Sequence, residues 1–401
     1  MNLKEIKENL NYIIDNNLHL EANGLKPYTV CLEGPHGVGK TAIIEEIAKD
    51  RGVHFKKVNL GAFEEVGDLT GFPVKMYKMR KGEDVIDVVE AALEAHRQEG
   101  YSLIPGVKPV MDFAIPSWVP KSENGANILL LDDYSRANPL ILQATMELLD
   151  KGELGSWKLP KNTQVVLTSN PDNGEYSVSS MDNAQKTRFI TFQTEFDVKL
   201  LAKHMEEVGV RDEFINFALI SPEIFNKNKN NSQATGRTYM AFARTLETVK
   251  DLASSDGLDR VINISSGIFN DPDNMISNQF TIFLNKKLDK LITPEDMINK
   301  PWKDVADILE KTVGHADSDK YRTDIAATLT FRLVNYTIHN LNKPGSNANT
   351  FINRIFDIVR HDKQFLTVDL IYSMVSKLFE DNPAKYSKLT TEQKLKDLLL
   401  G

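Results

Sequence analysis

A glycine-rich segment near the start of the chain carries residue types that bind phosphate. Residues 34–41 read GPHGVGKT and match the pattern G-x-x-x-x-G-K-[ST]. Glycines let backbone N–H groups turn inward around phosphate oxygens, and a helix that follows directs its positive end at the anion. The lysine then reaches the β- and γ-phosphates, and the threonine hydroxyl ligates Mg²⁺. The candidate phosphate-binding residues are Gly34, Pro35, His36, Gly37, Val38, Gly39, Lys40 and Thr41.

Polar side chains follow two apolar runs further along the chain. The run ILLL ends in Asp132 and Asp133, and the run VVLTS ends in Asn170. A buried strand would bring Asp132 to the sheet edge beside the glycine loop, where it can hold Mg²⁺ directly or through water. Asp133 could then polarise an attacking water as a general base. Asn170 could orient that water, or it could form an Asx-type turn.

Two arginines follow these motifs in the chain. Arg188 precedes an apolar run, and Arg237 begins a helical pattern in the second half. An arginine brought to a γ-phosphate stabilises the charge that develops during phosphoryl transfer. Taken alone, either residue would be interpreted as part of a surface ion pair.

The elements that must position these residues are visible as short apolar runs. Their near-continuous apolar character predicts strands buried on both faces of a parallel sheet that helices cover. Helical spacing over Thr41–Lys49 follows the glycine loop, so strand, loop, helix and strand form a βαβ unit. The predicted strands are Tyr28–Leu32, Val53–Val58, Asn127–Leu131, Gln164–Thr168 and Phe189–Phe192.

The second half of the chain has a different pattern. From about Glu195 onward, amphipathic helical spacing dominates and no strong strand is indicated. The predicted helices are Val198–Val208, Thr238–Leu252, Ile325–Leu341, Thr350–Val359 and Leu366–Phe379.

Composition excludes several classes of protein. A length of 401 residues suggests two or three domains. The net charge of -8 argues against a mainly electrostatic nucleic-acid binder, although it leaves room for a locally basic pore. Cys31 is the single cysteine, which excludes disulfides within the chain and zinc sites with two thiolates. No apolar run approaches the roughly 20 residues that span a bilayer, and no export signal is present, so we expect a cytoplasmic protein of a bacterium or a phage-infected cell.

The motifs, in their order along the chain, resemble those of an AAA+ ATPase. The segments are GPHGVGKT, ILLLDDYSRAN, VVLTSNP, KTRF and TGRTYMAFAR. More narrowly, they resemble the MoxR-like and dynein-related (AAA_5-type) branch, in which Arg-Ala follows the acidic strand, here Arg136-Ala137. GDLTGFP at 67–73 and AIPSWVP at 114–120 also look like segments of that branch. The resemblance covers roughly residues 25–250.

This resemblance implies an α/β P-loop NTPase fold. We expect an αβα sandwich with a parallel five-stranded sheet of order 5-1-4-3-2, followed by an all-α lid and a C-terminal helical extension. The implied domains are an N-terminal helix or linker at 1–24, a nucleotide-binding domain at 25–194, a lid at 195–290 and the extension at 291–401. Residues 61–125 would be an insertion that projects toward the pore of a ring.

The resemblance also implies roles for single residues. Asp132 matches the aspartate that holds Mg²⁺, and Asn170 matches the sensor-1 residue. Arg188 matches the arginine finger, which acts on the nucleotide of the neighbouring subunit, and Arg237 matches the sensor-2 arginine. The expected cofactors are therefore ATP and Mg²⁺, and the expected assembly is a homo-oligomeric ring, usually a hexamer. The family usually has glutamate where Asp133 stands, which puts the rate of hydrolysis in question.

Two local structures are expected within this frame. Glu83–Arg97 reads as a helix inside the insertion. Residues 152–160 would form a small hairpin with Trp157 near its tip. Trp157 is either a buried anchor of this hairpin or part of a pore element.

The leading functional hypothesis is a Mg²⁺-dependent ATPase that forms a ring and remodels or matures a protein partner. Relatives often act with partners that carry a von Willebrand A domain. A nucleotide-gated scaffold with little turnover is one alternative, and the aspartate at position 133 supports it. A DNA or RNA motor is another, which the acidic charge argues against. A P-loop kinase fits the positions of Asn170, Arg188 and Arg237 less well.

Overall fold

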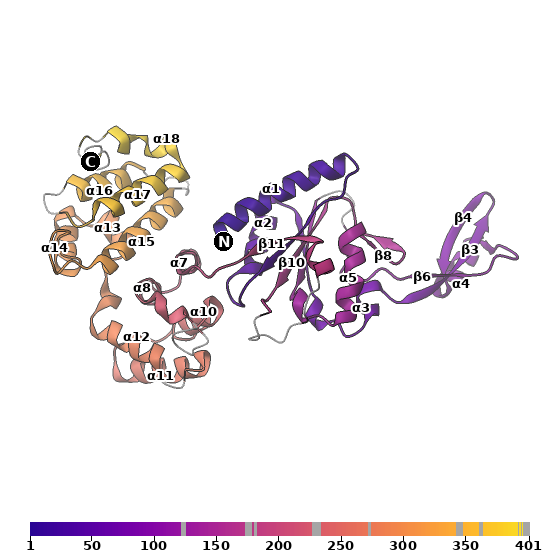
Figure 1. Ribbon diagram of the computed structural model, residues 1–401, viewed down its shortest axis with the longest axis horizontal. Coiled ribbons are helices and arrows are strands. Elements are labelled where there is room, and N and C mark those ends of the chain that lie inside the picture. Colours follow the sequence, from indigo (N-terminus) through magenta and orange to yellow (C-terminus); the bar gives the residue numbers. More distant parts are fainter. Residues whose placement is uncertain are drawn as a thin grey trace. The chain divides into compact units, whose positions relative to one another are not determined.

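A computed structural model describes residues 1–121, 126–172, 179, 183–226, 234–271, 274–341, 348–360, 364–391, 393 and 395. The chain divides into two compact units, Met1–Asp197 and Val198–Gly401 (Figure 1).

The first unit is built on a sheet of five parallel strands. Their order across the sheet is β11-β1-β10-β7-β2, which in chain order is 5-1-4-3-2 and confirms the predicted topology. Each predicted strand is present within one residue at either end, and the apolar runs of β1, β7 and β10 are buried along nearly their whole length. The strands are β1 (Thr29–Glu33), β2 (His54–Asn59), β7 (Asn127–Asp132), β10 (Thr163–Ser169) and β11 (Phe189–Gln193).

Helices cover both faces of this sheet, which makes an αβα sandwich. Alternate residues of one strand divide between two cores: Leu130 packs with α1 (Leu3–Ala22) and α2 (Lys40–Arg51), whereas Leu131 packs with α5 (Pro139–Lys151). The short helix α3 (Val66–Thr70) also lies on the α5 face. This division explains why the strands are apolar at successive positions.

The insertion contains a second, antiparallel sheet, which corrects one prediction. The central strand β3 (Pro73–Lys81) pairs with β4 (Asp84–Val89), β5 (Ser102–Leu103) and β6 (Val110–Phe113). The helix expected over Glu83–Arg97 is wrong in its first half, and α4 covers Leu93–Gln98 alone. The sequence DVIDVV is rich in β-branched residues, and pairing with β3 favours the strand. Figure 1 shows this sheet standing away from the five-stranded sheet.

Smaller elements complete the first unit. Strands β8 (Glu153–Leu154) and β9 (Trp157–Lys158) form the expected hairpin. Trp157 is 4% exposed, donates its Nε1–H to the carbonyl oxygen of Thr70 over 2.8 Å and contacts Trp118 edge to face. It is therefore a buried anchor of the hairpin. The remaining short elements are η1 (Leu60–Ala62), η2 (Glu90–Ala92), η3 (Tyr134–Arg136) and α6 (Asn183–Lys186).

The second unit is helical throughout its described part. A continuous apolar core joins its helices on both sides of residue 290, with Phe214, Phe242 and Phe280 in mutual ring contact. The helix expected over Thr238–Leu252 is shorter than predicted and ends at Thr245. The elements are α7 (Val198–Glu207), α8 (Asp212–Ile220), η4 (Pro222–Phe225), α10 (Gly236–Thr245), α11 (Ser255–Phe269), α12 (Met275–Asn285), η5 (Leu288–Lys290), α13 (Pro294–Asn299), α14 (Trp302–Thr312), α15 (Thr323–Leu341), α16 (Ala348–Arg360), α17 (Val368–Asp381), α18 (Pro383–Tyr386) and η6 (Ser387–Thr391).

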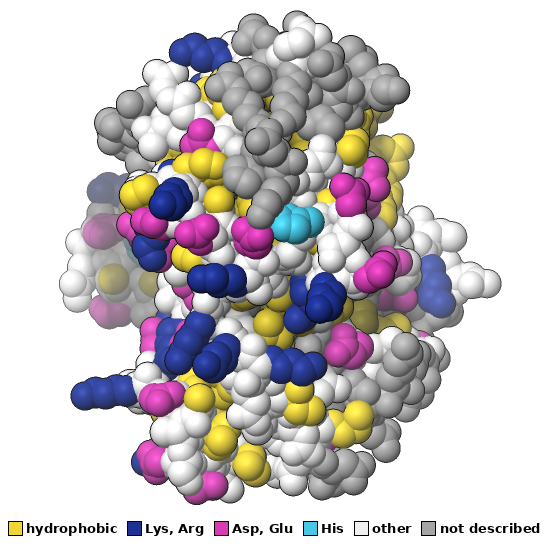
Figure 2. All heavy atoms as spheres, turned by 90° about the vertical axis from the view of Figure 1, so that its left-hand side faces the viewer, with side chains coloured by type: hydrophobic (Ala, Val, Ile, Leu, Met, Phe, Trp, Pro, Cys, Tyr) yellow, Lys and Arg dark blue, Asp and Glu magenta, His cyan; other side chains and the backbone are white. Residues whose placement is uncertain are grey.

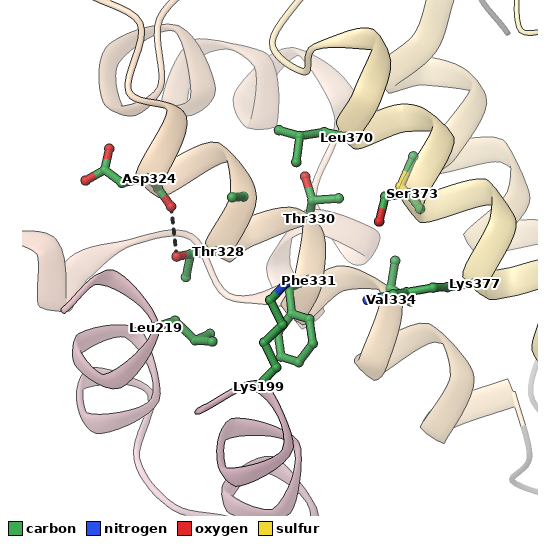
Figure 3. Close-up of a pocket in the computed structure, with 12 residues that line it drawn as sticks. Lys199, Leu219, Asp324, Thr328, Thr330, Phe331, Val334, Leu370, Ser373 and Lys377 are labelled. Atoms are coloured by element: carbon green, nitrogen blue, oxygen red, sulfur yellow. Dashed lines mark hydrogen bonds between the residues drawn. The ribbon is translucent and has the colours of Figure 1, made fainter. Parts of the chain in front are cut away.

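A cavity of about 180 Å³ lies within the second unit (Figure 3). Helices α15 and α17 form most of its wall, and Lys199 of α7 and Leu219 of α8 contribute the rest. The Nζ atom of Lys377 lies 5.4 Å from the ring centroid of Phe331, so a cation and an aromatic ring share one side of the cavity. The cavity therefore lies where helices from before and after residue 290 meet.

The face of the second unit in Figure 2 carries charges of both signs. Lysine and arginine side chains gather in a band, and acidic side chains lie above and below it. Such mixing produces no extended field of one sign on this face. In the part of the chain that the structure describes, no helix is long and apolar enough to cross a membrane.

Candidate functional site

The glycine loop lies between β1 and α2, at the carboxyl edge of the five-stranded sheet. Gly37 and Gly39 have φ angles of 75° and 98°, which L side chains rarely adopt, and Gly39 caps the amino end of α2. A Cβ atom on Gly34 would come within 1.9 Å of the Thr194 hydroxyl oxygen. These three positions therefore require glycine. Helix α2 begins directly after the loop, at Lys40.

The Lys40 ammonium lies in the centre of the loop. Its Nζ atom donates to the carbonyl oxygens of Gly34 and Pro35 over 2.6 and 2.8 Å, and it lies 3.4 Å from Oδ1 of Asn170. Lys40 is buried, and its partner Asn170, which directly follows β10, lies 130 residues further along the chain. The loop thus holds a buried cation where the motif requires one for phosphate.

Asp132 ends β7 beside the first turn of α2. Its Oδ1 atom accepts hydrogen bonds from the hydroxyl of Thr41 over 3.1 Å and from the hydroxyl of Thr168. Its Oδ2 atom lies 2.6 Å from the Nζ atom of Lys57 on β2. Burial raises the pKa of the Asp132 carboxyl, but the hydrogen bonds from Lys57, Thr168 and Thr41 outweigh it, so the pKa lies below the ordinary aspartate value.

Asp133 and Asn170 lie side by side next to this pair. Asp133 adopts a left-handed backbone conformation with φ of 53°, and its backbone N–H donates to the hydroxyl of Thr168. The Nδ2 atom of Asn170 lies 3.5 Å from Oδ1 of Asp133, while the Asn170 backbone N–H donates to Ser135. Asn170 is 4% exposed, so its amide is fixed between Lys40 and Asp133. The structure therefore brings the predicted base and the predicted water-orienting amide together.

The residues present fit a nucleoside triphosphate and Mg²⁺. Glycine-only backbone positions, a buried ammonium and a helix amino end together favour phosphate oxygens. Thr41 and Asp132 supply a hydroxyl and a carboxylate oxygen in contact with each other, which are hard ligands that suit Mg²⁺. Among the described residues, no group of three or more His, Cys, Asp or Glu is placed to hold a metal ion.

Arg188 lies at the amino ends of the strands, whereas Lys40 of the same chain lies beyond their carboxyl ends. Its neighbour Phe189 pairs with Thr29 at the start of β1, whereas the glycine loop follows the end of β1. The Nε atom of Arg188 donates to Oδ2 of Asp150 over 2.7 Å. Burial raises the pKa of Asp150, but Arg188 and Lys26 outweigh it and hold the pKa below the ordinary value. The structure does not bring Arg188 to the loop of its own chain.

Arg237 and His36 are the remaining predicted residues. Arg237 is exposed in the first turn of α10, which Thr235 and Thr238 cap reciprocally, and it belongs to the second unit. His36 is half-buried in the loop.

Three residues of the site were missed by sequence reasoning: Lys57, Thr168 and Ser135. Thr168 bridges the carboxylate of Asp132 and the backbone of Asp133, and Ser135 accepts from the backbone of Asn170. A lysine inside a predicted buried strand was a usable signal for Lys57, because a charge there needs a partner. Nothing in the local pattern indicates the partner itself.

Comparison with known proteins agrees with this geometry. The family described as AAA domain (dynein-related subfamily) matches residues 29–189, from the first residue of β1 to the first residue of β11. The chain contains an AAA domain of the dynein-related subfamily. The predicted resemblance to this branch is thereby confirmed, and the AAA domain includes the glycine loop, Asp132, Asp133, Asn170 and Arg188.

Relatives of this AAA domain are similar over short stretches. The chain is 36% identical over 70 residues to the Lon protease of Fusobacterium nucleatum subsp. nucleatum, covering 17% of this chain and 9% of that protein. It is 36% identical over 93 residues to the ATP-dependent protease ATPase subunit ClpY of Bacillus pumilus, covering 20% of each. The chain thus spans a fifth or less of these relatives. A solved structure of the Thermotoga maritima RuvB Holliday junction branch migration motor is 15% identical, with a TM-score of 0.34, and the match covers 64% of this chain and 67% of that chain.

Proposed function

We propose that this protein is a Mg²⁺-dependent ATP hydrolase of the MoxR type. The observation that carries the proposal is the contact of Thr41 with Asp132 beside the Lys40-filled glycine loop. These residues are the minimum that a P-loop enzyme uses to hold a triphosphate and its metal. The similarity to the ATP-dependent protease ATPase subunit ClpY supports the choice of nucleotide.

In this mechanism, the chain's own residues hold the substrate and direct a water molecule. Lys40 and the loop N–H groups bind the β- and γ-phosphates. Thr41 and Asp132 would hold Mg²⁺, which would supply stabilisation of negative charge on the phosphates. Asn170 orients the attacking water, and Asp133 accepts its proton. The contact between the two side chains supports this division of roles.

The test is steady-state release of phosphate from ATP, compared with a Lys40→Ala variant. We expect release that requires Mg²⁺ in the wild-type protein and is lost in Lys40→Ala. A Lys56→Ala variant serves as the control, since it removes a lysine of β2 outside the loop. ATP binding without release in the wild-type protein would instead support the nucleotide-gated scaffold.

We also propose that the protein assembles into a ring, as a hexamer. The position of Arg188, at the sheet edge opposite its own phosphate loop, supports a finger that acts on a neighbouring subunit's nucleotide. Arg237 would complete the site from the lid as the sensor-2 residue. Mass measurement with and without ATP and Mg²⁺ tests assembly, and a monomer under both conditions would contradict it.

Within this proposal, the ring remodels or matures a protein partner, one that carries a von Willebrand A domain. The exposed apolar side chains of the antiparallel insertion sheet support a polypeptide contact, because a sheet that stands away from the core has no structural need for them. They include Val85 of β4 and Val110 and Met111 of β6, with exposed fractions of 43–65%. Replacing Val110 and Met111 by serine should abolish partner stimulation of hydrolysis and leave the basal rate unchanged.

A further inference from the structure

Lys57 is a charged residue at the site for which the proposed mechanism has no role. It lies on β2, where it pairs in register with Leu130, two residues before Asp132 on the neighbouring strand. Its Nζ atom lies 2.6 Å from Oδ2 of Asp132, and its side chain is 45% exposed. The Lys57 side chain is therefore partly exposed to water, and its ammonium contacts the buried carboxylate of Asp132.

The two oxygens of Asp132 have different partners. Oδ1 faces the hydroxyls of Thr41 and Thr168, on the side of the phosphate loop. Oδ2 faces the ammonium of Lys57. The carboxylate is thus already neutralised by a cation that the chain supplies, at the position where the proposed enzyme would hold a divalent ion.

A second cation at this carboxylate would meet the charge of Lys57 at short range. Like charges a few ångströms apart repel strongly in a partly buried site. Lysine is a compact charge on a flexible stem, so it can withdraw toward water, but it then gives up its bond to Asp132. Either outcome opposes the binding of a divalent ion.

We propose that Lys57 is a built-in counter-ion of Asp132 that competes with Mg²⁺ and raises the Mg²⁺ concentration at which the metal acts on nucleotide binding. This inference rests on the proposed function, because it assumes that Asp132 and Thr41 hold the ion. Its consequence is regulatory: nucleotide binding responds to Mg²⁺ over a higher concentration range than it would without Lys57.

The experiment is titration calorimetry of ADP binding to the full chain at a series of MgCl₂ concentrations and in EDTA. The variants are Lys57→Met, which removes the charge, and Lys57→Arg, which keeps it. Lys56→Met is the matched control, since it makes the same change on the adjacent residue, whose side chain points to the other face of β2. Thermal melting checks that each variant folds, and Lys57→Gln replaces Lys57→Met if the latter does not.

We expect the Mg²⁺ concentration of half-maximal effect to fall at least about fivefold in Lys57→Met, as loss of a like charge at this distance implies. It should stay within about twofold of wild type in Lys57→Arg and Lys56→Met. An unchanged or increased value in Lys57→Met overturns the role of Lys57 while ADP binding itself survives. Failure of the wild-type protein to bind ADP under any condition overturns the nucleotide site and this inference with it.

Discussion

The hydroxyl of Thr41 donates a hydrogen bond to Oδ1 of Asp132 over 3.1 Å, although 91 residues separate the two in the chain. Parallel strands place their carboxyl ends at one edge, so α2 after β1 and the end of β7 meet there. Their contact joins two separate motifs into the site that we propose for a triphosphate and a divalent ion.

The aspartate at position 133 leads to the first prediction. Asp133→Glu should raise steady-state phosphate release several-fold and leave ADP affinity within about twofold, because one more methylene brings the carboxylate closer to a water held by Asn170. Asp133→Asn should lower the rate by about 10²–10⁴-fold, the usual contribution of a general base. Phosphate release and calorimetry check both, and an Asp133→Glu rate equal to or below wild type would count against a catalytic base at this position.

A mixing experiment tests whether Arg188 acts between subunits. Arg188→Ala alone should lose about 10³-fold or more in hydrolysis, the contribution of an arginine finger, and Lys40→Ala alone should be inactive. A mixture of the two should recover activity, since it contains interfaces with an intact loop facing an intact Arg188.

The Arg188 experiment has a structural control, because Asp150 pairs with a second cation besides Arg188. Lys26→Ala removes the other cation that contacts Asp150, at a distance of 3.1 Å, without touching Arg188. Both pairs are partly exposed, so either loss should cost less than about 1 kcal/mol of stability. If Lys26→Ala lowers hydrolysis as much as Arg188→Ala, the effect is structural and the finger assignment fails.

The lowered pKa of Asp132 predicts a pH dependence of stability. A depressed pKa means that the ionised form stabilises the fold above the ordinary aspartate pKa, near 4, and that this contribution disappears as the pH falls through the lower folded value. Asp132→Asn should therefore cost about 1–2 kcal/mol at pH 7, the scale of a charged hydrogen bond. The difference from wild type should shrink below pH 4. Urea unfolding of both proteins between pH 7 and 3 measures it, and a difference independent of pH would contradict the ion pair with Lys57.

Arg332 predicts a large effect on the stability of the second unit. It is 3% exposed on α15 and donates to Glu206 of α7 over 2.8 Å, to Asn216 of α8 over 2.9 Å and to Asp212. Removing one member of a buried charge group leaves the others without compensation, which costs about 3–5 kcal/mol. We expect Arg332→Met to destabilise this unit by that amount in urea unfolding.

The matched control for Arg332 is Arg322→Met. Arg322 directly precedes the same helix, α15, and pairs with Asp324 in its first turn. The side chain of Arg322 is 42% exposed. Such a pair contributes about 0–1 kcal/mol. Equal losses in the two variants would show that burial of Arg332 is not what makes its contacts matter.

The sequence by itself determined the framework of the AAA domain. The apolar runs of β1, β7 and β10 are typical of strands covered on both faces, and the glycine loop and the acidic end of β7 indicate their chemistry through residue types alone. Asp132, Asn170 and the loop were therefore predictable, because residues at the carboxyl ends of parallel strands lie at one edge of the sheet.

Only the tertiary structure decided the contacts that join distant strands. Lys57 meets Asp132 because the register of β2 against β7 places Lys57 opposite Leu130, and the expected strand order does not fix that register. The same reason applies to β4, whose residues read as a helix until β3 pairs with them, and to Arg332, whose burial depends on α7 and α8. Local propensity is a weak preference of tenths of a kcal/mol per residue, and burial against a distant partner exceeds it.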